Sequence, residues 1–388
     1  MKKIGVYIHI PFCKKKCFYC DFVSFSNKDS LQEIYINSLK KEIENFLKNR
    51  NELQIETVYI GGGTPSYIDS KNIFSIWDSF SFWDSSFSKR NVPNNKKIEK
   101  TIEVNPGTVT KGKLEDYKNA GINRLSIGLQ SANNKVLEEI GRIHTYEDFL
   151  ETYNLAKEVG FENINVDLMI GIPNQTIEDV KESLKNVIKL NPTHISVYSL
   201  IVEDGTPLAK MIEQGKLKLL DEDIERNMYW YVKDFLELKG YKHYEISNFS
   251  KPGFESKHNL NCWEQKEYIG FGISAHSYLN GVRFANTSNL EEYIKNCENN
   301  RFDANKSILE RQNLLDKENE YMLLGLRKID GVSIQSFKNK FNENPIFLFK
   351  EKLNKLVSIG LIQIDSDCII LTNKGLDLAN QVWQEFVE

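Results

Sequence analysis

The segment GVYIHIPFCKKKCFYC, residues 5–20, places three cysteines directly after a short β-rich run. Cys13, Cys17 and Cys20 have the spacing C-x3-C-x2-C. Three thiolates on one short loop can bind three irons of a [4Fe–4S] cluster and leave the fourth iron open for another ligand. A zinc site or buried free thiols are the alternatives. Structural zinc usually takes four ligands, and no fourth Cys or His follows at short spacing.

Around this loop, β-rich runs and helical patterns alternate over the first 200 residues. Such alternation predicts an α/β fold with a parallel sheet built from βαβ units. Six strands are too few for the eight-fold barrel, so we expect a partial, TIM-like (β/α)6 barrel with its site at the carboxyl ends of the strands. The expected strands are 5–10, 57–60, 100–104, 124–128, 163–169 and 194–199, and the expected helices are 31–47, 111–120, 146–159 and 177–190.

Glycines and polar residues recur at the ends of these predicted strands. Gly61-Gly62-Gly63-Thr64-Pro65 follows the second strand, and three glycines there remove every side chain where a ligand would approach the backbone. Glu103 ends the third strand, Gln130 ends the fourth, and Asp167 lies in the fifth. Each polar residue alone could be a helix cap or a satisfied polar group. Together they predict a ligand site at the barrel mouth.

The rest of the chain divides into two further regions, giving predicted boundaries at 1–200, 201–304 and 305–388. The middle region has a charged helical pattern at 221–239, a short strand at 243–247 and a Gly- and aromatic-rich stretch at 258–278. The last region has helices ending at Gly360 and two short strands, 361–364 and 368–371, an order that resembles a winged helix. A structural cap is the alternative. With 11 Lys/Arg against 12 Asp/Glu, this module lacks the basic surface of a DNA binder.

The composition is typical of a globular protein and not of a membrane-spanning one. The 388 residues are 40% hydrophobic and 27% charged, with a net charge of −4, as in ordinary globular proteins. This charge gives no general attraction to nucleic acid or to an anionic membrane. No apolar stretch approaches the roughly 20 residues of a membrane span, and the first residues do not read as a signal peptide. We therefore expect a cytoplasmic protein without a nucleic-acid partner, whose membrane contact, if any, is peripheral and made through a partner.

These motifs together resemble those of the oxygen-independent coproporphyrinogen III oxidase family of radical S-adenosylmethionine (SAM) proteins. The resemblance runs from Tyr7 to the C-terminal module. It rests on Tyr-x-His-Ile-Pro-Phe-Cys, the cysteine spacing, GGGTP and the run Asp-Leu-x-x-Gly-x-Pro that begins at Asp167. It implies a [4Fe–4S] cluster on Cys13, Cys17 and Cys20, with SAM bound at the open iron. Electron transfer from the cluster would cleave the sulfonium and form a radical.

The resemblance also implies individual roles. Tyr7 would contact SAM, Tyr19 would pack on its adenine, and Glu103 would help hold its amino-acid part. Arg142 is a group that could neutralise a carboxylate, with a surface ion pair as the alternative. The remaining SAM contacts implied are Gly62, Gly63, Thr64, Gln130, Arg142 and Asp167.

Two departures separate this chain from the oxidases of that family. The oxidases carry a fourth cysteine two residues after the third, whereas Cys20 is followed here by Asp21 and Phe22. They also have a longer segment before the residue that corresponds to Tyr7. Both departures favour the heme-chaperone branch, whose members are implied to bind the cluster, SAM and heme and to deliver heme to hemoproteins. The alternatives are a radical SAM oxidase of coproporphyrinogen III or a related substrate, and a protein whose cluster is structural or regulatory.

The segment HNLNCW, residues 258–263, resembles the heme-linked His-Asn-x-x-Tyr-Trp motif of that branch, with Cys262 in place of the tyrosine. We expect His258 to be an axial heme ligand, with Cys262 and His276 as further candidates, because imidazole and thiolate both ligate heme iron. Trp263 could stack on the macrocycle. A hydrogen-bonded structural histidine is the alternative for His258.

Three consecutive lysines, Lys14, Lys15 and Lys16, separate the first two cysteines. They predict either a solvated loop or a docking patch for an acidic reducing partner such as a flavodoxin.

Overall fold

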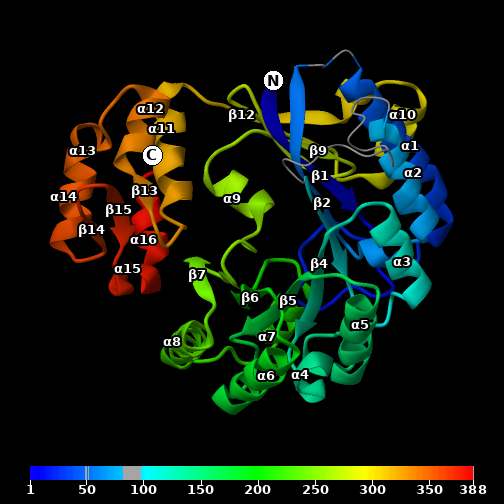
Figure 1. The fold of residues 1–388 in the computed structure, drawn as a ribbon, viewed down its shortest axis with the longest axis horizontal. Helices are drawn as coiled ribbons and strands as arrows, with labels where there is room; N and C mark the ends of the chain where they lie inside the picture. Colours follow the sequence, from blue (N-terminus) through cyan, green and yellow to red (C-terminus); the bar gives the residue numbers. More distant parts are fainter. Residues whose placement is uncertain (49, 51, 82–97, 388) are drawn as a thin grey trace.

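The computed structural model describes residues 1–48, 50, 52–81 and 98–387. Its core is six parallel strands in sequence order, each hydrogen-bonded to the next, which confirms the predicted partial barrel (Figure 1). The observed strands contain the predicted ones and extend several of them. They are β1 (Lys2–Ile10), β2 (Leu53–Gly62), β3 (Glu99–Val104), β4 (Arg124–Gln130), β5 (Asn163–Ile170) and β6 (His194–Ser199).

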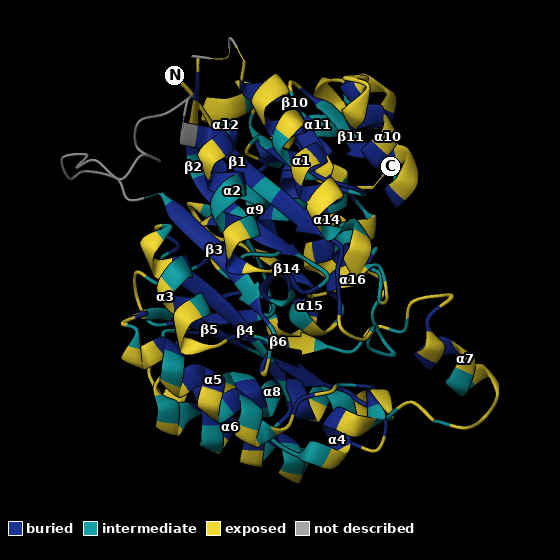
Figure 2. Ribbon diagram, turned by 90° about the vertical axis from the view of Figure 1, so that its right-hand side faces the viewer, coloured by how far each residue is buried: buried dark blue, intermediate teal, exposed yellow. Residues whose placement is uncertain are grey.

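Helices cover the outside of this sheet, and the strands beneath them are mostly buried (Figure 2). Capping boxes start α5 and α6, where Thr145 and Thr176 each accept a hydrogen bond from a backbone N–H in the first turn. The sequence reading missed α2, whose Ser- and Phe-rich composition is weakly helical. The helices are α1 (Gln32–Leu47), α2 (Ser70–Ser81), α3 (Lys111–Asn119), α4 (Asn134–Glu139), α5 (Tyr146–Glu158) and α6 (Ile177–Leu190).

Strands beyond residue 200 extend both edges of the sheet to twelve strands among the described residues. On one edge two strands pair antiparallel beside β6; on the other, one strand runs parallel to β1 and three antiparallel strands follow. The predicted boundary at residue 200 stays a prediction, although strands from both sides share one sheet. The added strands are β7 (Lys242–Glu245), β8 (Asn248–Ser250), β9 (Tyr268–Phe271), β10 (His276–Leu279), β11 (Val282–Asn286) and β12 (Lys306–Arg311), with helices α7 (Pro207–Glu213), α8 (Glu222–Leu238), α9 (Lys257–Trp263) and α10 (Leu290–Glu298).

The C-terminal module has its own apolar core and the expected winged-helix-like order. Helices precede a hairpin, and a short earlier strand completes a three-stranded antiparallel sheet. Its elements are α11 (Leu314–Gly325), β13 (Val332–Ser333), α12 (Ile334–Phe341), α13 (Pro345–Leu348), α14 (Lys350–Ser358), β14 (Ile362–Ile364), β15 (Cys368–Leu371), α15 (Asn373–Asp377) and α16 (Ala379–Gln384).

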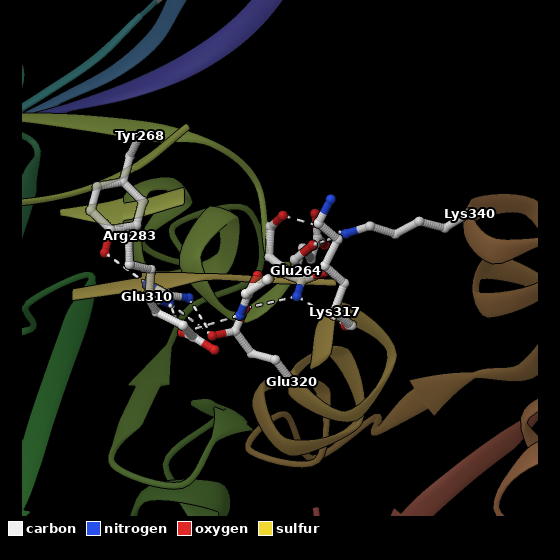
Figure 3. A network of polar contacts seen from close by, with 9 residues as sticks. Glu264, Tyr268, Arg283, Glu310, Lys317, Glu320 and Lys340 are labelled. Atoms are coloured by element: carbon white, nitrogen blue, oxygen red, sulfur yellow. Dashed lines mark hydrogen bonds and ion pairs between the residues drawn. The ribbon is translucent and has the colours of Figure 1, made fainter. Parts of the chain in front are cut away.

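A polar network joins this module to the end of α9, between the module and the barrel (Figures 1 and 3). Lys340 of α12 donates to the backbone carbonyls of Glu264 and Gln265, just after α9. The Gln265 side chain donates to the Glu320 carboxylate at 2.7 Å, and Arg283 of β11 donates from Nε to the same carboxylate at 2.9 Å. The C-terminal end of α9 is therefore held by groups of the module, one of which, Glu320, also binds Arg283 of the sheet.

Within the described residues, no helix is both long enough and apolar enough to span a lipid bilayer.

Candidate cofactor site

The cysteine loop leaves the carboxyl end of β1. Cys13 is buried, Cys17 and Cys20 are half-buried, and all three are free thiols. Backbone hydrogen bonds hold the loop at separate points: Cys13 N donates to the Phe25 carbonyl at 3.0 Å, and Phe18 N donates to the Ile140 carbonyl at 3.0 Å. The loop is therefore fixed without using its thiols.

Two of the sulfurs accept side-chain hydrogen bonds. Thr64 Oγ1 donates to Cys13 Sγ at 3.4 Å, and Arg142 Nη1 donates to Cys17 Sγ at 3.6 Å. Burial raises the pKa of the Cys20 thiol to about 11, so binding a cluster must displace protons. Among the described residues, no three His, Cys, Asp or Glu side chains form a group suited to a single metal ion. A cubane binds each thiolate to a different iron, so its ligands need not converge on one point.

The glycine run after β2 lets the chain pass close to this loop. Gly62 has φ +111°, and a Cβ there would lie 2.6 Å from the His9 ring. A Cβ on Gly63 would lie 3.0 Å from Cys13 Sγ and equally close to two backbone carbonyls. These glycines therefore admit the cysteine loop, a role the sequence reading did not assign. Their contact with SAM stays a prediction, as does that of Thr64.

His9 is a site residue that sequence reasoning quoted in a motif but did not single out. Its Nδ1 lies 3.0 Å from the Tyr7 hydroxyl, and its Nε2 lies 2.8 Å from the Val23 carbonyl, beyond the last cysteine. Burial lowers the pKa of His9 to about 4, so the ring is neutral at physiological pH. The signal was its position two residues after Tyr7, on the same face of the strand.

Two carboxylates lie inside the barrel. Glu103 accepts from the Tyr59 hydroxyl at 3.0 Å and from Gly62 N at 3.1 Å. Asp167 accepts from the Ser126 hydroxyl at 3.2 Å and from the Asn165 amide at 2.7 Å. Both side chains are half-buried because they face the lumen. Burial, with the Asp167 charge as the second cause, raises the pKa of Glu103 to about 7, and burial raises the pKa of Asp167 as well. Such a pair favours a cationic ligand.

Arg142 lies beside these groups and not in a surface ion pair. Its Nη2 donates to the Gly128 carbonyl at 2.7 Å and to the Asn105 side chain. Gln130, at the end of β4, has φ +70°, and its amide lies close to Gly128. Tyr19 packs against a small apolar cluster that includes Met169. The structure thus brings Arg142 and Gln130 together near Gly128.

His258 lies at the opposite end of the barrel from the cysteine loop. Its Nδ1 lies 2.9 Å from Thr57 Oγ1, and its backbone N–H donates to the Glu99 carboxylate at 3.0 Å. Thr57 precedes Gly62 by five residues, roughly 17 Å along an extended strand. The residue is 8% exposed, and burial lowers the pKa of its ring to about 4.

The other candidates near His258 face different surroundings. Burial raises the pKa of the Cys262 thiol to about 11. Trp263 stacks on the Arg327 guanidinium, which lies 4.4 Å from its ring centroid and 4.7 Å from that of Trp383. His276 is exposed at the start of β10. The aromatic residue expected to stack on a macrocycle therefore contacts an arginine of the C-terminal module.

Two family patterns match the chain: the Radical SAM superfamily over residues 7–187 and the HemN C-terminal domain over residues 313–378. The heme chaperone HemW of Lactococcus lactis is 35% identical over 100% of this chain and 98% of its own length. The chain belongs to the HemW family of radical SAM proteins.

Other relatives agree with this placement. The Bacillus subtilis heme chaperone HemW is 36% identical over 99% of both chains. A Danio rerio protein named radical S-adenosyl methionine domain-containing protein 1, mitochondrial, is 30% identical over 97% of this chain and 85% of its own. Coproporphyrinogen III oxidase (HemN) of Escherichia coli has the same fold, with a TM-score of 0.82 at 23% identity over 99% of this chain and 90% of its own.

Proposed function

We propose that this HemW family member is a heme chaperone that binds a [4Fe–4S] cluster, SAM and heme, and transfers heme to hemoproteins. The observation that carries this proposal is the full-length similarity, at 35% and 36% identity, to two proteins named heme chaperones. We expect it to act in the cytoplasm.

Cys13, Cys17 and Cys20 are the proposed cluster ligands. Their loop fits a cluster because it is held by backbone bonds, carries free thiols and lies against a glycine that leaves no room for a side chain. When bound, the cluster would supply one electron and an open iron for the amino-acid part of SAM. Thr64 and Arg142 would donate hydrogen bonds to the coordinated sulfurs.

The barrel mouth is the proposed SAM site. Glu103 and Asp167 would face the cationic groups of SAM, and Tyr7 and Tyr19 would contact it beside the cluster. The remaining proposed contacts are Gly62, Gly63, Thr64, Gln130 and Arg142.

We propose that heme binds at the α9 segment with His258 as a ligand. Because His258 is 8% exposed and bonded to Thr57, ligation requires α9 to move away from the barrel. That movement would also separate Trp263 from Arg327 of the module. Cys262 and the exposed His276 are the alternative ligands.

A reducing partner such as a flavodoxin is proposed to dock beside the cysteine loop. Lys14 is exposed there, whereas Lys16 donates to the Phe22 carbonyl at 2.9 Å and Lys15 lies 5.4 Å from the Phe18 ring centroid. Lys14 is thus the lysine with the fewest local contacts in this loop, and an acidic partner would meet it first.

The test is an anaerobic hemin titration followed by visible spectroscopy. We expect one tight heme per wild-type chain, loss or spectral change in His258→Ala, and easier binding in Thr57→Val, which keeps the imidazole and removes its buried partner. His276→Ala is the control for the exposed histidine. Equal weakening by His258→Ala and Thr57→Val would assign His258 a purely structural role.

The radical SAM oxidase is the second candidate, favoured by the two lumen carboxylates that suit SAM. Reductive SAM cleavage coupled to turnover of coproporphyrinogen III, with no stoichiometric heme binding, would move it to first place.

A further inference from the structure

Arg124, the first residue of β4, is a buried cation without a direct partner. It is 2% exposed, and within the described part of the chain its guanidinium makes no hydrogen bond or ion pair. Its Nε is a buried nitrogen without an acceptor. A guanidinium stays protonated in proteins, so its burial must be compensated by charges further away.

The strand register places Arg124 beneath the lumen carboxylates. Arg124 and Ser126 lie on the same face of β4, because side chains alternate along a strand. Arg124 pairs with Thr101 of β3, whereas Ser126 pairs with Glu103. Ser126 also donates to Asp167 of β5. The Arg124 backbone therefore lies two residues, roughly 7 Å along the strands, from the level of the carboxylates. An arginine side chain can span that distance.

Electrostatics point to the same arrangement. The Arg124 charge lowers the pKa of Glu103 and of Asp167, opposing the upward shift that burial causes in both. The pKa values of His194 and His258 are lowered first by burial and second by the Arg124 charge. Besides the two carboxylates and Arg124 themselves, the titratable and charged groups around them are Tyr7 (β1), Tyr19 (cysteine loop), Tyr59 (β2), Arg142 (between α4 and α5), His194 and Tyr198 (β6), Tyr244 (β7) and His258 (α9).

We propose that Arg124 is a positioning residue of the SAM site, whose buried guanidinium favours the ionised forms of Glu103 and Asp167 so that both can face the cationic ligand. This inference rests on the proposed SAM site. The two carboxylates carry two negative charges when ionised, and the guanidiniums of Arg124 and Arg142 both lie near them. SAM, with a sulfonium, an ammonium and a carboxylate, brings one net positive charge. Without the guanidinium, burial and their mutual repulsion would make both carboxylates bind protons more readily, and the site would lose the negative charge that attracts SAM.

The test measures SAM affinity by calorimetry on the cluster-loaded full chain between about pH 6 and pH 9. Arg124→Met should weaken binding about tenfold or more at pH 7, and affinity should recover as the pH rises, because one pKa unit corresponds to a tenfold change. Arg124→Lys keeps the charge and should stay within about threefold of wild type. Cluster absorption should be unchanged in both variants, and Arg311→Met, on exposed β12, is the surface control.

A double variant separates charge balance from folding. Arg124→Met/Asp167→Asn removes one carboxylate together with the cation, so it should bind SAM no more weakly than Asp167→Asn alone. A pH-independent loss in Arg124→Met, additive losses in the double variant, or a folded Arg124→Lys that binds no SAM would overturn the inference. Equal affinity of wild type and Arg124→Met would overturn the inference alone. Absence of SAM binding by wild type would overturn the proposed site as well.

Discussion

The polar groups at the two ends of the barrel differ in their hydrogen bonding. We call the amino ends of the strands the floor of the barrel and their carboxyl ends its mouth. At the floor, both ring nitrogens of His194 have partners, with Nδ1 2.6 Å from the Asn165 side chain and Nε2 2.7 Å from the Tyr244 hydroxyl. At the mouth, Cys17 and Cys20 are half-buried free thiols, and the lumen carboxylates have raised pKa values. Saturated hydrogen bonding contributes to stability, whereas partly exposed, charged groups are available to a ligand. Arg124, whose Nε lacks an acceptor, departs from this pattern at the floor. The hydrogen-bonded floor residues therefore act as scaffold and the mouth as binding site.

The heme-linked segment of α9 also departs from this division, because a ligand is proposed to bind there although it lies at the floor. α9 lies at the floor, where Glu99 accepts hydrogen bonds from the backbone N–H groups of Lys257 and His258. The His258 ring lies beside Thr57 and Tyr59 of β2, whereas the cysteine loop lies against Gly63, just beyond the carboxyl end of that strand.

The largest effect is expected from a cluster ligand at the mouth. Cys17→Ala should abolish the iron–sulfur absorption near about 400 nm after anaerobic reconstitution, because a cubane cannot keep its site with one thiolate missing. Cys368→Ala, in the C-terminal module, is the matched control and should keep the full absorption. An unchanged spectrum of Cys17→Ala would refute the ligand assignment.

The next largest effect is expected from a substitution in the glycine run that follows β2. Gly63→Ala places a Cβ 3.0 Å from Cys13 Sγ and from two carbonyls, so the loop or the ligand must shift. We expect SAM affinity, measured by calorimetry, to fall about tenfold or more, since a small misplacement of bound groups has large effects. Gly112→Ala, whose new Cβ would meet nothing nearer than 4.0 Å, should bind SAM normally.

A substitution at the floor should lower stability and leave SAM affinity unchanged. Glu99→Ala leaves two N–H groups at the start of α9 without their acceptor and should lower the free energy of unfolding by about 1–3 kcal/mol. Urea unfolding measures the loss, with exposed Glu115→Ala as control. SAM affinity should stay unchanged; a large loss of SAM binding would contradict the separation of the two ends.

The smallest effect is a pH dependence at the mouth. The pKa of Glu103 is raised in the folded protein from 4.5 to about 7, so the folded state binds this proton more tightly than the unfolded state. The resulting stability is present in full below about pH 4.5 and is lost as the pH rises through about 7. In SAM-free protein, raising the pH from about 5 to about 7.5 should lower the unfolding free energy of wild type by about 1–2 kcal/mol more than that of Glu103→Gln. Parallel profiles would show that Glu103 does not titrate in this range.

The candidate residues at the barrel mouth could be predicted from the sequence because the patterns that indicate them are local. The cysteine spacing, the glycine run and Glu103 are each visible within a few residues, and strand ends are brought together by any parallel barrel. Sequence reasoning did not reach His9 or Arg124, because a histidine and an arginine within strands show their importance only through neighbours from other strands. For the same reason it placed Trp263 beside a macrocycle and could not anticipate Arg327.

The sequence by itself determined the alternation of strands and helices, the winged-helix-like order of the last module and the spacing of the three proposed cluster cysteines, since periodicity and ligand spacing are properties of short segments. Only the tertiary structure decided that strands beyond residue 200 extend both edges of the barrel sheet. It also decided that His258 lies against Thr57 at the floor and that Arg124 lies beneath two carboxylates. Such placements follow from the packing of side chains that are distant in sequence, and no local pattern encodes them.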